Sequence, residues 1–417
     1  MKLLLPLFLF LLASCFIART VSASALSTAQ LDCMRALLSL IPTTTGTFVT
    51  DPCAFPGVTC SNASSSLLHV VQISLPSSGM TGQLPDSIGA LSSLTHLDLS
   101  GNSLTGTLPA SMAALTSLTS LNLGANKLDR SFRMTSPPYL FLCNPPQPFF
   151  SLCLYRHTSP SSNSFSGPFP HFIGNMQNLT YLNLNRNSFA GELPPSWAQL
   201  TLLQELHVSY TGITRLPPFI HMLQSLVIIS SFKSRLSGAI PPSITSLPHL
   251  SWLLLMENQL HGSLPPDIGN LASLTELVVL QNKLSGSIPD SIGNLTNLVA
   301  LTLYGNAFTG SIPHTIGHIL PNPSTHSPGL LFLSLNQNQL SGSIPPNLGR
   351  LPLVILYLNE NSLTGAIPPD LCQLFNGPAF TMSPNALWLN QNKLSAALPP
   401  CFGQMPYEQH PSFTMFL

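Results

Sequence analysis

One sequence unit recurs along most of this chain, and its fixed spacing constrains the fold more than any other feature. The clearest copy is LTHLDLSGNSLTGTLPASMAALTS, residues 94 to 117. Each copy carries one anchor position: Ser78, Asn102, Asn126, Asn163, Asn187, Thr211, Ser234, Asn258, Asn282, Asn306, Asn338, Asn361 and Asn392. Seven of the twelve intervals between these anchors are 24 residues and two are 23. Such a period predicts a solenoid of stacked units, whose function is carried by a long curved surface.

The residues inside one unit predict its local structure. Leu97-Asp98-Leu99 alternates with period two, which predicts a short strand with one buried face. We expect Asn102 to turn inward, because an amide carries the donors and the acceptor that buried backbone groups need. Gly106 permits unusual backbone angles, and Pro109 favours an extended segment before it. Stacked copies therefore predict a parallel sheet backed by a buried ladder of asparagines.

The unit LxxLxLxxNxLxGxIPxxLGxL resembles the plant-type leucine-rich repeat, and residues 270 to 293, NLASLTELVVLQNKLSGSIPDSIG, match it closely. The segment from Asp51 to Cys60 is similar to the N-terminal cap of that family, with Phe55-Pro56 where a tryptophan is common. The resemblance covers about residues 30 to 405. It implies an α/β repeat solenoid, a horseshoe with a parallel concave sheet and a disulfide-stapled N-terminal cap. It also implies recognition roles like those of receptor-like proteins, receptor-kinase ectodomains and polygalacturonase-inhibiting proteins.

The chain divides into four parts. Residues 1–25 read as a signal peptide, because Lys2 precedes an apolar run and small residues offer cleavage sites. Residues 26–66 form the cap, in which Leu31 to Ile41 has helical spacing and Pro42 ends the helix. About thirteen repeats fill 67–405, and 406–417 is a tail. We expect no transmembrane segment beyond the signal peptide, since no later apolar run is long enough.

Insertions interrupt the repeats near 131–162 and 319–329, and a smaller one lies at 377–383. The first separates Asn126 from Asn163 and removes the strand expected before Asn163. Two interpretations stay open for it: a loop of the kind this family uses to bind ligands, or an artefact of the gene model such as a retained intron. The second insertion is followed by an intact strand pattern, Phe332 to Leu335, so it predicts a protruding loop.

Cysteine and asparagine positions predict covalent features of a secreted chain. Of the eight cysteines, Cys15 leaves with the signal peptide, and Cys53 and Cys60 are predicted to form a disulfide that closes a tight loop. The pairing of the others stays open: Cys33, Cys143, Cys153, Cys372 and Cys401. Three sequons predict glycosylation, at Asn62, Asn178 and Asn294.

Composition and motifs exclude several classes of function. Charged residues make up 7% of the chain and the formal net charge is zero, so no basic patch is available for nucleic acid. The sequence contains no Gly-rich phosphate loop, no HExxH and no GxSxG, and its histidines lack ligand spacing. We therefore expect no enzyme, no metal site and no cofactor.

The outward side chains of the strands, on the concave face, form the candidate binding site. They are polar in the first units, apolar and aromatic in the middle, and Phe332, Tyr357 and Trp388 continue the aromatics toward the end. An exposed apolar patch with aromatic anchors is typical of a partner site. The predicted ligand-binding residues are Tyr210, Phe232, Trp252, Leu254, Met256, Val278, Leu280 and Tyr304.

These observations predict a secreted or cell-surface recognition protein of the extracellular space or cell wall. It would bind a peptide, oligosaccharide or protein without catalysis, in signalling or defence, and a co-receptor is a further candidate partner. Attachment to the cell surface would then run through a partner. Two alternatives stay open: a structural protein of the cell wall or matrix, and a truncated receptor-kinase ectodomain from an incomplete gene model.

Overall fold

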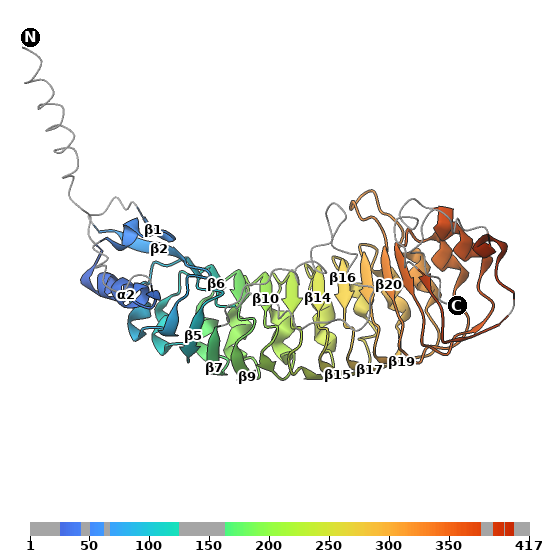
Figure 1. Ribbon diagram of the computed structural model, residues 1–417, viewed down its shortest axis with the longest axis horizontal. Coiled ribbons are helices and arrows are strands. Elements are labelled where there is room, and N and C mark those ends of the chain that lie inside the picture. Colours follow the sequence, from blue (N-terminus) through green and yellow to red (C-terminus); the bar gives the residue numbers. More distant parts are fainter. Residues whose placement is uncertain are drawn as a thin grey trace, which may run out of the picture.

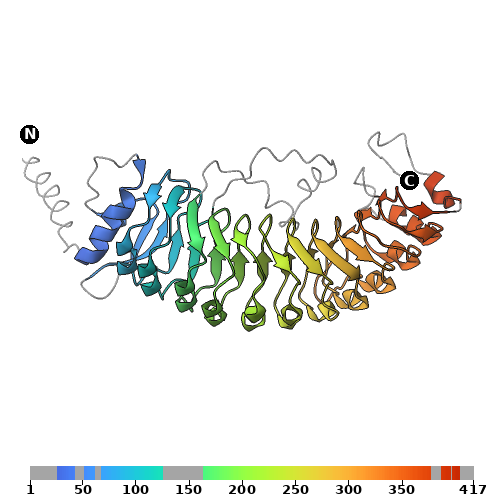
Figure 2. The same ribbon diagram turned by 90° about the horizontal axis from the view of Figure 1, so that it is seen from below.

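The computed structural model describes residues 26–42, 51–61, 67–124, 163–376, 387–395 and 397–403. They form a stack of repeats bent into a shallow arc, with a long sheet along the inner edge and short 3-10 helices along the outer edge (Figures 1 and 2). The predicted signal peptide at 1–25, the whole first insertion at 131–162, the third insertion and the tail at 406–417 lie outside the described residues. So do Asn62, Asn126, Cys143 and Cys153.

Within the described residues, the inner sheet has thirteen strands, of which only β1 is antiparallel, to β2, while the other twelve run parallel. Each parallel strand pairs with the equivalent residues of its neighbour, so that Trp252, Glu276 and Ala300 stand side by side on β14, β16 and β18. The strands are β1 Val58–Ser61, β2 His69–Ser74, β4 His96–Asp98, β6 Ser120–Asn122, β8 Tyr181–Asn183, β10 Glu205–His207, β12 Ile228–Ser230, β14 Trp252–Leu254, β16 Glu276–Val278, β18 Ala300–Thr302, β20 Phe332–Ser334, β21 Ile355–Tyr357 and β23 Leu387–Trp388.

Shorter strands follow most of the described anchors and form a second, interrupted layer. Three small sheets contain β3 Thr81–Gln83, β5 Ser103–Gly106, β7 Ser164–Pro168, β9 Ser188–Gly191 and β11 Gly212–Ile213; β13 Ser237–Gly238, β15 Gln259–Gly262, β17 Lys283–Ser287 and β19 Ala307–Thr309; and β22 Thr364–Gly365 and β24 Lys393–Leu394. Gly106 lies in this layer with φ +82°, the left-handed angle that glycine tolerates.

The chain returns to the inner sheet through 3-10 helices. A proline in extended conformation precedes most of them, for example Pro109 with φ −60° and ψ 135°, as the sequence pattern predicts. The helices on the outer edge are η3 Asp86–Ala90, η4 Ala110–Ala114, η7 His171–Asn175, η8 Pro195–Gln199, η9 Pro218–Met222, η10 Pro242–Ser246, η11 Ile268–Asn270, η12 Asp290–Asn294, η13 His314–His318, η14 Pro346–Arg350, η15 Pro369–Asn376 and η17 Pro400–Gly403.

The predicted asparagine ladder is present. The Asn282 amide nitrogen donates to the carbonyls of Leu255, Val279 and Leu280 at 3.0, 3.0 and 3.2 Å, and its oxygen accepts from the Leu260 amide at 3.0 Å. One side chain thus joins two neighbouring repeats and satisfies backbone groups that the turn leaves without partners. Thr211 and Ser234 replace the amide with a hydroxyl, which still donates to Val208 O at 2.7 and 3.0 Å.

A residue with positive φ precedes most anchors, and sequence reasoning missed it. Tyr210, Glu257 and Gln281 have φ values of 54°, 52° and 51°, and Gly305 has 69° at the same place in its repeat. This left-handed residue turns the chain from the strand to the inward-facing anchor. Because most of these residues are not glycine, the sequence did not indicate a positive φ at these positions.

Both ends of the stack carry a disulfide. Helix α2, Thr28–Leu38, begins at the cap residue Ser27, and η2, Pro52–Ala54, leads into β1. The disulfide predicted between Cys53 and Cys60 is present. At the other end Cys372 bonds Cys401, a pairing that sequence alone left open. Cys33 is a free thiol with 0% exposure, so it is sealed from any other chain, and burial raises its pKa.

The first insertion interrupts one repeat instead of separating two. Strand β6 pairs directly with β8, so no strand stands between them. Asn163 donates to the carbonyls of Leu99 and Leu123 and accepts from the Leu104 amide, all at 3.0 Å. These are the contacts that the ladder requires of the anchor following β6, a position that spacing assigned to Asn126. Asn163 therefore completes the repeat that β6 begins.

The second insertion is a short hairpin on the surface. The backbone amide of Asn322 donates to Ser327 O at 2.9 Å, and the Ser327 amide donates to Asn322 O at 3.1 Å. Ile319 and Leu330 on either side are fully buried, and β20 follows in register with β18. The loop therefore adds surface beside the inner sheet without disturbing the stack.

Candidate ligand-binding surface

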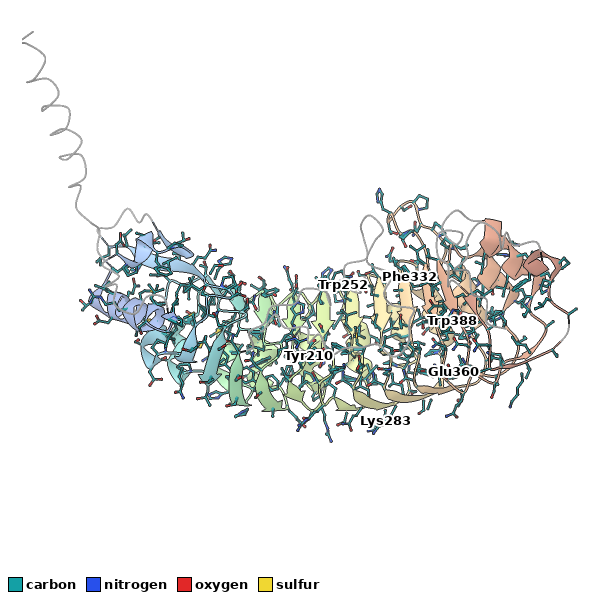
Figure 3. All side chains as sticks on the ribbon, in the orientation of Figure 1. Tyr210, Trp252, Lys283, Phe332, Glu360 and Trp388 are labelled. Atoms are coloured by element: carbon teal, nitrogen blue, oxygen red, sulfur yellow. A yellow bond between two sulfur atoms is a disulfide. The ribbon has the colours of Figure 1, made fainter. Side chains whose placement is uncertain are left out.

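The eight predicted ligand-binding residues lie together on the inner sheet, in the middle of the arc. Phe232, Leu254, Met256, Val278 and Leu280 form one apolar cluster, and Tyr210, Trp252 and Tyr304 pack against it. Alternation along each strand places these side chains on the same face, opposite the leucines of the core. Figure 3 shows Tyr210 and Trp252 on the middle strands, with Phe332 and Trp388 continuing toward the C-terminal end. We call this set the concave cluster.

The concave cluster is less exposed than an open apolar patch. Its five central side chains expose 7% or less of their surface, while Tyr210, Trp252 and Tyr304 are half-buried. In a parallel sheet, equivalent side chains stand roughly 4.8 Å apart, so members of the cluster pack against one another. Sequence reasoning judged each position by its outward direction and did not predict that the five central side chains are buried. The three aromatic residues offer the cluster's more accessible surface.

Charged side chains border the concave cluster at the carboxyl ends of β8, β12 and β14. The Arg186 guanidinium lies 3.9 Å from the Tyr210 ring centroid, and Lys233 Nζ lies 5.4 Å from that of Phe232. Lys233 also pairs with Glu257 at 3.2 Å. Burial raises the pKa of Glu257, and the Lys233 ammonium partly opposes that shift. The border is therefore polar, and its charged side chains already contact partners within the protein: Lys233 contacts Glu257, and Arg186 contacts Tyr210.

A second apolar cluster continues along the sheet. It consists of Ala300, Phe332, Ile355 and Tyr357, with Trp388 packed against it. The Tyr357 and Trp388 ring centroids are 5.1 Å apart, and burial raises the pKa of the Tyr357 hydroxyl. The predicted set stopped at Tyr304, although the aromatic residues at equivalent positions of later repeats carried the signal.

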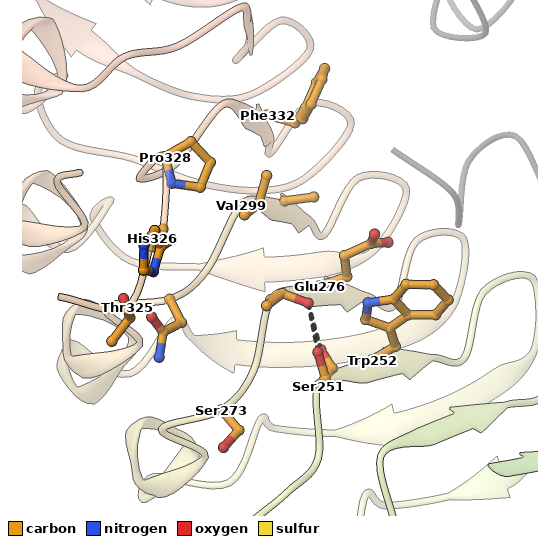
Figure 4. Close-up of a pocket in the computed structure, with 13 residues that line it drawn as sticks. Ser251, Trp252, Ser273, Glu276, Val299, Thr325, His326, Pro328 and Phe332 are labelled. Atoms are coloured by element: carbon orange, nitrogen blue, oxygen red, sulfur yellow. Dashed lines mark hydrogen bonds between the residues drawn. The ribbon is translucent and has the colours of Figure 1, made fainter. Parts of the chain in front are cut away.

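A pocket of about 500 Å³ opens where the second insertion meets the inner sheet (Figure 4). Trp252, Glu276, Ala300 and Phe332 line it from four successive strands, and His326 lines it from the loop. Glu276 exposes 7% of its surface, and its Oε2 atom is buried without a hydrogen-bond partner. Burial raises the pKa of this carboxyl to about 7. Glu276 lay outside the predicted set because a lone acid among apolar residues reads as an exposed surface charge.

Two of the predicted glycosylation sites fall within the described residues. Asn178 and Asn294 are both exposed, Asn178 just after η7 and Asn294 at the end of η12. The Asn178 amide nitrogen donates to Thr116 O at 3.0 Å. Both sites belong to the turns on the outer side of the arc, and their glycosylation stays a prediction.

Family models for the leucine-rich repeat match residues 69–128 and, separately, 178–200, 273–295, 329–351 and 352–374. These segments coincide with the strand, anchor and 3-10 helix of the structural repeats. These segments of the chain are leucine-rich repeats. Across the parts that the structure describes, none of its helices has the length and apolarity that a bilayer crossing requires.

Plant receptors are among the proteins that this chain resembles. Receptor-like protein 41 of Arabidopsis thaliana is 30% identical over 147 residues, which is 35% of this chain and 15% of that protein. The crystal structure of PEPR1–AtPEP1 matches with a TM-score of 0.67 and 28% identity, over 93% of this chain and 51% of that one. The plant peptide hormone receptor RGFR1 in complex with RGF2 gives 0.61 and 29%, over 78% and 44%.

The matched part spans about half or less of the chains of these relatives. The same fold also occurs in a plant ice-binding protein, with a TM-score of 0.56 and 22% identity over 90% of this chain. Leucine-rich-repeat architecture is therefore shared by proteins with different ligands, and the ligand must be argued from side chains.

Proposed function

We propose that this protein recognises an extracellular ligand, non-covalently and without catalysis, on the inner face of its arc. The observation that carries the proposal is the concave cluster, which gathers three accessible aromatic side chains around an apolar centre on one rigid sheet. Aromatic anchors dominate the energetics of interfaces, and a preformed sheet lowers the ordering cost of binding.

A secreted or cell-surface role in plant signalling or defence fits this proposal best. The solved relatives include a plant peptide hormone receptor in complex with its ligand, which supports a peptide above an oligosaccharide or a large protein. Disulfides at both ends of the stack are typical of the secretory pathway. A purely structural wall protein would have no need of aromatic residues gathered on one face.

The test is a binding measurement on a double variant, Trp252→Ala with Tyr304→Ala. With a partner identified from the extracellular fluid, affinity should fall by roughly 2 kcal/mol or more, as hot-spot aromatics produce. Folding should survive, because both side chains lie outside the leucine core. The matched control is Leu202→Ala with Met222→Ala, which removes apolar side chains that are 49% and 44% exposed away from the inner sheet. Unchanged affinity in the well-folded test variant refutes the concave site.

A further inference from the structure

The first positions of four successive strands form a row with an unusual order of side chains. Trp252, Glu276, Ala300 and Phe332 are paired in register across β14, β16, β18 and β20. In Figure 4 the side chains of Trp252, Glu276 and Phe332 point to the same side of the sheet. An acid thus stands beside one aromatic residue and is separated from a second by an alanine.

The alanine leaves a slot between Glu276 and Phe332. These two residues are two strand spacings apart, which is roughly 10 Å. A planar or alkyl group held between two walls needs about 7 Å, since carbon contacts lie at about 3.5–4.0 Å. The pocket of about 500 Å³ that these residues line therefore has room for one side chain of a ligand with its end beside Glu276.

The chemistry of the slot selects a cation. The Oε2 atom of Glu276 is buried without a partner, and an unpaired buried carboxylate carries a desolvation cost that an opposite charge offsets. Trp252 and Phe332 line the same pocket, and aromatic rings attract ammonium and guanidinium groups. Within the described lining, the only other titratable side chain is His326, on the loop. Neither flanking strand contributes a charge, because Trp252 and Ala300 occupy the positions on either side.

We infer that this slot binds the basic side chain of a peptide ligand, an arginine or a lysine, through Glu276 and the two flanking aromatic rings. The inference rests on the proposed function and names the chemistry of one subsite. A peptide is favoured over a small free amine because the pocket adjoins the concave cluster, whose half-buried Trp252 and Tyr304 leave apolar surface for the residues that neighbour the basic one.

The probe is a pair of capped tripeptides, acetyl-Leu-Arg-Leu-amide and the same peptide with citrulline, which keeps the shape of arginine and loses its charge. We expect the arginine peptide to bind the wild-type protein at least about 10-fold more tightly, with the preference lost in Glu276→Gln. Glu205→Gln is the matched control, because Glu205 occupies the same row on β10 but is paired with His207 at 2.9 Å. That variant should keep the preference.

Proton release supplies a second readout. A bound cation favours the ionised carboxylate, so calorimetry near pH 7 in two buffers should show protons released on binding. Release should disappear in Glu276→Gln and persist in His326→Asn, which separates the carboxyl from the loop histidine. A structural role for Glu276 alone would not produce this pattern.

Three results would overturn the inference: equal binding of the two peptides, no binding of either at about 10 mM, or an arginine preference that survives in Glu276→Gln. The proposed function is tested separately from the basic subsite. A partner that remains sensitive to Trp252→Ala with Tyr304→Ala, in a protein without arginine preference, would contradict only the basic subsite. Arginine preference with a partner insensitive to that double change would contradict the wider concave surface instead.

Discussion

At the scale of single residues, the anchor asparagines hold the stack together. Each one forms hydrogen bonds with backbone groups of two repeats, so its substitution leaves several backbone donors and acceptors without partners at once. Each buried polar group left without a hydrogen-bond partner lowers the free energy of unfolding by about 1–3 kcal/mol. The adjacent left-handed residue makes no comparable set of contacts, and Gln281 is exposed. Substitution at the anchor should therefore lower the free energy of unfolding much more than substitution at the residue directly before it.

This contrast is tested by comparing Asn282→Leu with Gln281→Leu in chemical denaturation. The first variant should lose roughly 2 kcal/mol or more of unfolding free energy, because four hydrogen bonds to backbone groups disappear. The second should stay close to the wild type. Equal midpoints for the two variants would mean that the ladder contributes little to stability.

Glu276 predicts a pH effect on stability with a definite sign. Burial raises its pKa from 4.5 to about 7, so between these values the folded protein holds a proton that the unfolded chain has released. Stability contributed by this group is thus greatest below about 4.5 and falls as pH rises to about 7. One pKa unit corresponds to about 1.4 kcal/mol, so the loss amounts to about 3 kcal/mol at most.

The measurement is the difference in unfolding free energy between the wild type and Glu276→Gln as pH is raised. Taking the difference cancels other titrating groups, among them His326 and Glu257. Relative to the wild type, the variant should gain stability between about pH 4.5 and 7 and then level off. A constant difference across this range would show that the carboxyl is not desolvated.

At the scale of elements, the repeat unit tolerates a long interruption between its strand and its anchor. Leu123 O and the Asn163 amide lie 3.0 Å apart, so the two borders of the first insertion meet in space. Removing residues 125–161 would leave 24 residues between Asn102 and Asn163, the regular period. The insertion is thus an addition to a complete repeat.

The deletion of residues 125–161 should therefore give a folded protein with a thermal midpoint near that of the full chain. An equal deletion of residues 213–249 is the control, since it removes about one and a half repeats and breaks the register of the stack. Circular dichroism and cooperative unfolding report the outcome. An aggregated or non-cooperative protein after the first deletion would contradict the role assigned to Asn163.

The same elements show how far the sequence predicts this fold. The period, the strand, the ladder, the extended segment at the proline and the Cys53–Cys60 disulfide are all local patterns, and all are present. Spacing assigned the anchor after β6 to Asn126, whereas Asn163 is the asparagine that reaches Leu123 in the structure. The burial of Phe232 and the buried, unpaired Oε2 atom of Glu276 involve residues outside their own repeats, which no local pattern contains.

At the scale of the whole molecule, the inner face changes character along the arc. The early strands present polar groups such as His96, Asp98 and Asn122, whereas the middle and later strands present the two apolar clusters. A ligand guided by apolar burial should therefore dock toward the C-terminal half. The second insertion stands beside this half and lines the pocket that holds Glu276.

The most direct test of concave recognition is site-specific photo-cross-linking to a partner recovered by the intact protein. A benzophenone side chain is placed at Trp252, on the inner sheet, or at Leu202, which is 49% exposed in the turn before β10. Docking on the inner face predicts a strong cross-link from position 252 and none from position 202. A cross-link from position 202 alone, with the partner still bound, would contradict it.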